Sequence, residues 1–380
     1  MAEIRLQINL DRGNLLTKAF VKVYRGRNII TEKRYKFSSM IANTQSKAAE
    51  GVVIPKRKGI FYCGNRALMI EGAELHMPLA DGDKLENLAA TVASLIAIVK
   101  KDSGISFVRP TVDIAVSTPF VTDATTKALY KELRSIGDGF TTSEGDIINP
   151  HFQRFCVVPE GRTYLMVNPD YNGIIDFGSG TIQGAIRKPD GGIATVNAHG
   201  GDRGGANYWI SDALQSDSFI NEARKLKRNN IPTPEQLSVI LGQAKWDFAG
   251  FSLEKHLRST MKKSLNIVAN TAKALDVEQK RHNDVFTLGD RVYALIGGGS
   301  CLLEKVLSPR EQQQLSQSGI HIIGADKDAD YANVLTMSEI VSKERINWPN
   351  YQELETSRIA RVEAARAKRA AAKVETSAHA

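Results

Sequence analysis

The chain has 380 residues, a length that exceeds one ordinary hydrophobic core and predicts about two domains. Hydrophobic residues make up 42% and charged residues 24% of it, which excludes a disordered chain or a membrane-embedded one. The formal net charge of +8 suits an acidic ligand, a nucleic acid or a membrane surface, and it selects none of them.

The cysteines and the N-terminus bear on where the protein resides. Cys63, Cys156 and Cys301 are odd in number and far apart in the sequence, which favours reduced thiols over a disulfide framework. The N-terminal segment MAEIRLQINL lacks the basic start and apolar core of a signal peptide. The longest apolar run, residues 88–99, is too short for a bilayer span of about 20 residues. We therefore expect a cytoplasmic protein in which this run is a buried helix.

Alternating apolar residues predict strands near the start of the chain. Residues 4–10 and 19–24 alternate on either side of Gly13 and Asn14, a pattern typical of a β-hairpin. Four further elements are expected before residue 150: a strand within 59–70, a helix over 85–101, a buried strand over 111–119 and a helix near 122–136. Thr122 and Asp123 are suitable capping residues for the last of these.

A second strand-rich block begins near residue 154. Residues 171–188, YNGIIDFGSGTIQGAIRK, again read as strand, Asp-Gly turn and strand. The remaining expected elements are a charged helical stretch over 206–284, strands over 285–296, a glycine loop that opens a helix, a strand over 319–323 and a short helix near 335–344. Residues 355–380 are rich in Ala, Arg, Lys and Glu, which predicts a solvated helix or disorder. A polybasic contact of this tail with a membrane, a nucleic acid or a partner is the alternative.

Three glycine turns each follow an apolar strand: DRGN at 11–14, DFGSGT at 176–181 and IGGGS at 296–300. A tight glycine turn lets backbone N–H groups approach phosphate oxygens, because no side chain blocks them. Two such hairpins facing each other would hold a polyphosphate from both sides. Asp11 and Asp176 would then point at Mg²⁺ through water, and Lys18 would reach the phosphates as a point charge. Either hairpin turn alone is more typical of an ordinary hairpin than of a phosphate site, and none of the three turns matches the Walker A or Rossmann pattern.

The order of these segments resembles a known superfamily. DRGNLLTKAF, DFGSGTIQGA, GGDRGG and ALIGGGSCLL follow one another as the phosphate and adenosine loops do in the actin, sugar-kinase and heat-shock ATPase superfamily. DRGNLLTK resembles the D-x-G-N-x-x-T-K form of the bacterial plasmid-segregation actins of the ParM type, and VVPEG at 157–161 and DADYANVLTM at 328–337 resemble further pieces of them. Ser179 stands where a glycine is usual, and Leu335 and Thr336 replace the glycine that usually follows ANV. The first departure bears on the rate of hydrolysis more than on binding.

The resemblance implies an α/β fold of two related actin-like (ribonuclease H-like) domains that flank a nucleotide cleft. Residues 1–160 would form domain I, with a helix at about 336–347 packing back on it. Residues 161–335 would form domain II, with the helical insertion 206–284.

The resemblance also implies roles for individual residues. The first phosphate loop would consist of Asp11, Gly13, Asn14, Thr17 and Lys18, and the second of Asp176, Gly178, Ser179, Gly180 and Thr181. The ribose and base would lie against Gly297, Gly298, Gly299 and Ser300, with Gly200 and Gly201 nearby. Glu160 and Asp176 would be catalytic, with Glu160 orienting the attacking water, although in isolation Glu160 reads as a solvated loop acid. Asp11 and Asp176 would hold Mg²⁺ through water.

The function that the resemblance implies is a filament-forming ATPase that polymerises with ATP and Mg²⁺, such as a plasmid-segregation motor or another cytoskeletal scaffold. GTP in place of ATP stays open. The expected partners are further copies of the chain and a DNA-binding adaptor, without direct sequence-specific binding of nucleic acid. Two alternatives remain: a monomeric small-molecule kinase of the same superfamily, and a nucleotide-binding scaffold with weak turnover, for which Ser179 is the only indication.

Overall fold

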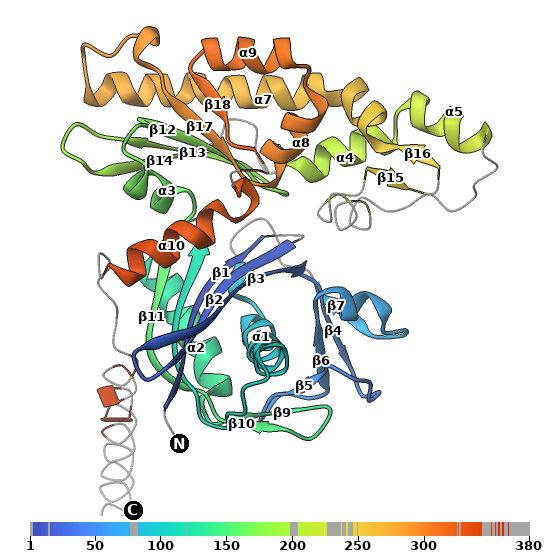
Figure 1. Ribbon diagram of the computed structural model, residues 1–380, viewed down its shortest axis with the longest axis vertical. Helices are drawn as coiled ribbons and strands as arrows, with labels where there is room; N and C mark the ends of the chain where they lie inside the picture. The colour runs from blue at the N-terminus through green and yellow to red at the C-terminus, as the bar shows by residue number, and fades with distance from the viewer. Residues whose placement is uncertain are drawn as a thin grey trace, which may run out of the picture.

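The computed structural model describes residues 3–13, 16–76, 83–119, 121–197, 204–225, 246–248, 250–324, 326 and 328–343, and the isolated residues 237, 241, 351, 354, 356, 357, 359, 360 and 364. Two five-stranded sheets dominate these residues, one in the lower and one in the upper half of Figure 1, with helix α10 between them. None of the described helices combines the length and the apolar character needed to cross a membrane.

The first sheet has the strand order β11-β8-β1-β2-β3. Its strands are β1 (Ile4–Arg12), β2 (Leu16–Arg25), β3 (Asn28–Ser38), β8 (Thr111–Thr118) and β11 (His151–Pro159). The β1–β2 hairpin is antiparallel, whereas β1 and β11 each run parallel to β8. The predicted hairpin and buried strand are therefore present, and they lie side by side.

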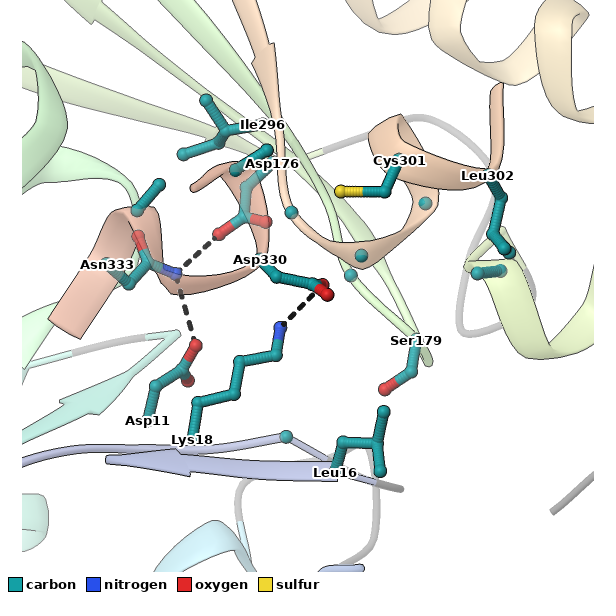
Figure 2. A pocket seen from close by; sticks show the side chains of 18 of the residues that line it. Asp11, Leu16, Lys18, Asp176, Ser179, Ile296, Cys301, Leu302, Asp330 and Asn333 are labelled. Carbon is teal, nitrogen blue, oxygen red and sulfur yellow. Dashed lines mark hydrogen bonds and ion pairs between the residues drawn. The ribbon is translucent and has the colours of Figure 1, made fainter. Parts of the chain in front are cut away.

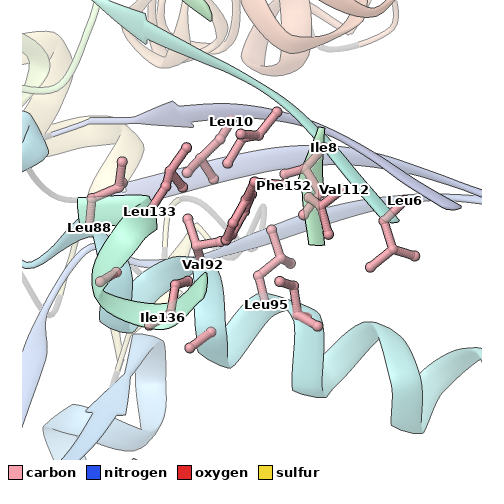
Figure 3. Close-up of a cluster of buried hydrophobic side chains, with 14 of the residues drawn as sticks. Leu6, Ile8, Leu10, Leu88, Val92, Leu95, Val112, Leu133, Ile136 and Phe152 are labelled. Carbon is pink, nitrogen blue, oxygen red and sulfur yellow. The ribbon is translucent and has the colours of Figure 1, made fainter. Parts of the chain in front are cut away.

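Helices cover both faces of this sheet. Leu6, Ile8 and Leu10 pack on α1 (Leu88–Ser103) and α2 (Asp123–Gly137) in the core that Figure 3 shows. Because side chains alternate along a strand, Asp11 belongs to the opposite face, which α10 (Ala332–Ser342) covers. Thr122 caps α2 as predicted, since its hydroxyl accepts a hydrogen bond from Thr125 N.

A smaller, six-stranded sheet lies beside α1, in the order β10-β9-β5-β6-β4-β7. Its strands are β4 (Ile41–Thr44), β5 (Val52–Val53), β6 (Ile60–Cys63), β7 (Glu74–His76), β9 (Phe140–Thr142) and β10 (Ile147–Ile148). The 3-10 turns η1 (Gly64–Met69) and η2 (Asp83–Leu85) follow β6 and β7 along the chain.

The second large sheet repeats the plan of the first, in the order β14-β13-β12-β17-β18. Its strands are β12 (Gly173–Phe177), β13 (Ile182–Arg187), β14 (Ile193–Asn197), β17 (Tyr293–Ile296) and β18 (Ile320–Ile322). An antiparallel hairpin, β12–β13, again has a parallel neighbour on its first strand, here β17. Ile175 and Phe177 face the second core, so Asp176 points to the other side.

Helices again cover this sheet. The helices with described bounds in this half are α3 (Arg162–Val167), α4 (Ala206–Leu214), α5 (Asp217–Lys225), α7 (Leu253–His282), α8 (Gly298–Val306) and α9 (Pro309–Gln317). The long helix α7 packs on β12 and β13, as Figure 1 shows at the top. The short hairpin β15 (Asp247–Phe248) and β16 (Phe251–Ser252) interrupts the stretch 206–284, which is otherwise mostly helical in its described residues.

Two predicted elements differ from the structure. Of the strands expected over 285–296, the structure has only β17, because Thr287 and Asp290 form a capping box around the 3-10 turn η3 (Leu288–Asp290). A helix is expected near 335–344, and a helix at about 336–347 is expected to pack on domain I. Both expectations correspond to α10, which begins earlier, at Ala332, and ends at Ser342. The turn η5 (Ala329–Tyr331) leads into it.

Two predictions about larger segments stay predictions. The buried residues of the two largest cores come from 4–155 and 175–320, while the exact limits of the two domains are not fixed by these cores. Most of the 355–380 tail lies outside the described residues; its described positions 356, 357, 359, 360 and 364 are helical.

Candidate functional site

A cavity of about 380 Å³ lies where the two hairpins approach each other, and both large sheets contribute to it. Asp11 and Asp176 are the second-to-last residues of β1 and β12, and each points away from the face of its sheet that packs into a core. Among the predicted site residues, the cavity is lined by Asp11, Gly13, Lys18, Glu160, Asp176, Gly178, Ser179, Gly180, Thr181, Gly297, Gly298 and Gly299.

Asn333 joins the two aspartates, as Figure 2 shows. Its Nδ2 donates to Asp176 Oδ2 at 2.9 Å and to Asp11 Oδ2 at 3.4 Å, and its Oδ1 accepts from Gly161 N at 3.1 Å. Asp11 also accepts from Ser117 Oγ at 2.7 Å. Burial, followed by the nearby Asp11, raises the pKa of Asp176. The two carboxylates thus approach from separate sheets and share one donor.

Two lysines of the first sheet meet the carboxylate of Asp330, in η5, inside the cavity. Lys18 Nζ lies 3.7 Å from Asp330 Oδ1, and Lys36 forms a closer ion pair with the same carboxylate. Burial opposes the charge on Lys18, but Asp330, followed by Asp11 and Asp176, outweighs it and raises the lysine's pKa. Burial likewise opposes ionisation of Asp330, and Lys18 and Lys36 outweigh it, so the pKa of this carboxyl is lowered.

Glu160 follows the end of β11, where its N–H donates to Thr118 O at 2.9 Å. Its carboxylate pairs with Lys84, and each of the two side chains is only 8% exposed. Burial raises the pKa of Glu160 to about 7, since the opposing effect of Lys84 is smaller and Asp11 and Asp176 add to the rise. The interpretation of Glu160 as a solvated loop acid is therefore wrong.

The two hairpin turns have the same closing hydrogen bond. Gly13 N donates to Leu16 O at 3.1 Å, and Gly178 N donates to Thr181 O at 3.0 Å. These two N–H groups are used within their turns, so the expectation that they point at a ligand is wrong for both. At Gly13 the missing side chain lets the two ends of the turn lie close together, because a Cβ at this position would lie 2.8 Å from Leu16 O.

Two predicted binding residues do not line the cavity. Thr17 lies between Leu16 and Lys18 on β2, so its side chain takes the other face, where its hydroxyl lies 2.9 Å from Ser39 Oγ. Ser300 is fully buried and donates to Gly297 O at 2.7 Å and Ile323 O at 2.9 Å. Both residues hold the loops in shape. Asn14, Gly200 and Gly201 lie outside the described residues.

Several cavity residues were not foreseen. Asn333 and Asp330 lie in DADYANVLTM, a segment that the resemblance singled out without giving either residue a role. Lys36 and Lys84 also line the cavity, and no motif marks them. Their contacts with Asp330 and Glu160 arise only from the tertiary fold.

The donor set fits a hard cation that keeps most of its own water. Within the ranges that the structure describes, no cluster of three or more His, Cys, Asp or Glu side chains forms a ready metal site. Asp11 and Asp176 supply carboxylate oxygens, the ligand type that Mg²⁺ prefers, and Mg²⁺ is usually completed by water and phosphate oxygens. The two residues thus fit the predicted water-mediated arrangement.

The fold is shared with solved structures of actin homologues. No protein-family model and no curated protein matches the chain. The archaeal actin homologue Ta0583 in complex with ADP superimposes with a TM-score of 0.58 at 19% identity, covering 89% of this chain and 99% of that one. A chain of a 15-stranded ParM filament from Clostridium botulinum gives a TM-score of 0.56 at 14% identity, covering 89% and 99%. MreB 5 of Spiroplasma citri bound to AMPPNP gives 0.52 at 14% identity, covering 93% and 99%.

The class of protein is therefore defined by its architecture: the chain has the actin-like fold. The predicted fold class, two related α/β domains around a cleft, is confirmed. The similar structures include ParM proteins, so the resemblance drawn from the sequence is confirmed at the level of the fold.

Proposed function

We propose that the protein is a ParM-type, filament-forming ATPase that binds ATP and Mg²⁺ in the cavity between the two hairpins. The observation that supports this best is the pair Asp11 and Asp176, held by Asn333 at the meeting point of two turns with matching hydrogen bonds. Among the similar structures, one is a complex with ADP and another is a ParM filament.

The residues around the cavity divide into an anionic and a cationic group. Asp11 and Asp176 would hold Mg²⁺ through water, and the bound ion would neutralise charge that develops on the phosphates. Lys18 and Lys36 would give up part of their contact with Asp330 to pair with phosphate oxygens. The glycines at 297–299 would let a nucleoside lie against the start of α8.

Glu160 would accept the proton of the attacking water. A general base works best when its pKa lies near the operating pH, and burial raises the pKa of Glu160 to about 7. Its position at the end of β11 directs its carboxylate into the same cavity as both aspartates. Asp176 would assist by fixing the metal and its water.

Filament formation would use contacts that join the front of one copy to the back of the next and do not close into a ring. Sedimentation of the purified protein with ATP and with ADP tests the proposal. We expect a pellet that forms with ATP and Mg²⁺ and redissolves as phosphate is released. If no polymer appears with either nucleotide, the proposal is wrong.

A cytoplasmic location and plasmid segregation through a DNA-binding adaptor remain predictions from the sequence, and GTP in place of ATP stays open. Neighbouring genes would test the adaptor, because a small DNA-binding protein encoded beside this one would support segregation.

A further inference from the structure

The ion pair between Lys84 and Glu160 is more enclosed than the pairs that Lys18 and Lys36 form with Asp330. Both side chains are 8% exposed, and both line the space that also holds Asp11 and Asp176. Burial alone would lower the pKa of Lys84, but Glu160, then Asp11 and then Asp176 outweigh it and raise that pKa. Lys84 is therefore a cation surrounded by the carboxylates of the candidate site.

Arg12 fixes the backbone that carries Lys84. Its side chain is 1% exposed, and its Nη1 donates to Lys84 O at 3.0 Å and also to the carbonyl of Glu86. Arg12 is the last residue of β1 and stands between Asp11 and the turn at Gly13. A buried guanidinium that donates to two carbonyls thus links the 84–86 segment to the end of β1, next to this turn.

The chain of contacts therefore runs from the first turn through Arg12 and Lys84 to Glu160. We propose that Lys84 is a positioning residue that holds Glu160 before a nucleotide binds and exchanges this contact for the terminal phosphate of a nucleoside triphosphate. Lys84 then distinguishes a triphosphate from a diphosphate, and its departure leaves Glu160 free to act on water. This inference rests on the proposed function, because it requires a nucleotide in the cavity.

The physical reason is competition between two anions for one buried ammonium group. Without a ligand, Glu160 neutralises Lys84 in a place where an unpaired charge would be costly. A terminal phosphate carries more negative charge and more acceptor oxygens than one carboxylate, so it attracts the ammonium more strongly. A diphosphate lacks this group, so Lys84 stays with Glu160.

The inference is tested by isothermal titration of the full chain with ADP and with the non-hydrolysed analogue AMPPNP. Both titrations contain Mg²⁺ and use the protein below its assembly concentration. We expect Lys84→Met to weaken AMPPNP binding by about tenfold or more, while ADP binding changes by less than about twofold. Lys84→Arg should keep most of the wild-type ratio of the two affinities. Glu160→Gln should raise the affinity for AMPPNP relative to that for ADP, because the substitution releases Lys84 and leaves the charge of the lysine in place.

The exposed pair of Lys101 and Glu50, 3.0 Å apart, offers a matched control. Lys101→Met removes the same charge from a Lys–Glu pair outside the cavity and should leave both affinities unchanged. An unchanged AMPPNP to ADP ratio in Lys84→Met overturns the inference, as does an equal loss for both ligands. If Lys84→Met does not fold, Glu160→Gln decides, and an unchanged ratio there overturns the inference as well.

The same titrations separate this inference from the proposed function. A wild-type chain that binds neither ligand would contradict both. A wild-type chain that binds both ligands and polymerises with ATP, but whose affinity ratio ignores Lys84, would contradict the inference alone.

Discussion

At the scale of single residues, Asn333 supplies the hydrogen-bond donor that two buried carboxylates share. We expect Asn333→Ala to lower the free energy of unfolding by about 1 to 3 kcal/mol, because Asp11 and Asp176 lose this donor and Gly161 N loses its acceptor in a buried place. Urea denaturation without nucleotide measures the change.

Asn168→Ala is a suitable control for this prediction. Asn168 Nδ2 makes one hydrogen bond, to Tyr164 O at 2.9 Å, at the end of α3, so its loss should cost less. Equal stability of Asn333→Ala and the wild type would show that the two aspartates do not need the amide.

The raised pKa of Glu160 predicts how hydrolysis depends on pH. A protonated carboxyl does not accept a proton from water, so the rate of phosphate release should rise with pH and level off above about 7. Glu160→Gln should reduce the rate by about a hundredfold or more and remove this dependence, while filaments still form. Initial rates of phosphate release between about pH 5.5 and 8.5 test both statements.

The sign of the associated stability effect is also fixed. The folded protein binds the Glu160 proton more tightly than the unfolded chain does, because the pKa of this carboxyl is near 4.5 when the chain is unfolded. This group's contribution to stability is therefore greatest at low pH and is lost as the pH rises toward about 7.

The control for the pH dependence of hydrolysis is Glu50→Gln. It changes an exposed carboxylate and should leave the pH profile of phosphate release unchanged. A flat wild-type profile would contradict the role of Glu160 as base.

At the scale of elements, the turn between β17 and α8 needs glycine for two reasons. Gly297 has a φ of +92°, and a Cβ there would lie 2.6 Å from Asp176 Oδ1 and 2.7 Å from Phe177 O. We expect Gly297→Ala to displace Asp176 and to weaken nucleotide binding by about tenfold or more, which corresponds to about 1.4 kcal/mol. Titration with ADP measures the loss.

Gly191 is a control that separates the effect of the positive φ from the effect of close contact with a Cβ. It has a similar φ of +80°, but a Cβ at this position would meet nothing within 4 Å, so Gly191→Ala carries only the backbone strain of about 1 to 2 kcal/mol. It should lower the melting temperature without changing the affinity for ADP. If both alanine variants bind ADP as the wild type does, the turn at Gly297 does not shape the site.

The same elements show how far the sequence could go. Alternation and turn residues identified both hairpins, because these signals are local, and α2 begins at the predicted cap. Alternation also explains why Lys18 lines the cavity and Thr17 does not, which the family pattern obscured. Local signals do not reach contacts such as Asn333 with Asp11, 322 residues apart, or Lys84 with Glu160, 76 residues apart. These contacts depend on the tertiary packing of elements that are far apart in the chain, such as α10 against β1.

At the scale of the whole molecule, the two halves are linked across the cavity by charge. Lys18 of β2 and Lys36 of β3 both pair with Asp330 of η5, and Arg34 pairs with Asp328 at 2.5 Å and lies over the ring of Tyr331. Lys18 and Lys36 are 12% and 16% exposed, whereas Arg34 is 44% exposed. The enclosed part of this link should therefore matter more than its exposed part.

Asp330→Asn tests how this link and the ligand compete for the same lysines. Without nucleotide, the variant should be less stable by about 1 to 3 kcal/mol, because two largely buried ammonium groups lose their carboxylate. ATP phosphates would then replace Asp330 as the partner of these lysines, so the variant should bind ATP more tightly than the wild type. Since ligand at about 100 times its Kd adds about 2.7 kcal/mol, saturating ATP should raise the melting temperature of Asp330→Asn by more than that of the wild type.

Asp328→Asn is the matched control, because it removes a neighbouring carboxylate whose partner Arg34 is exposed. Its melting temperature should rise with ATP by the same amount as that of the wild type. An equal rise for Asp330→Asn would mean that Lys18 and Lys36 stay with η5 when ATP binds. The two halves would then be held together by the protein alone, and the nucleotide would not control the link between them.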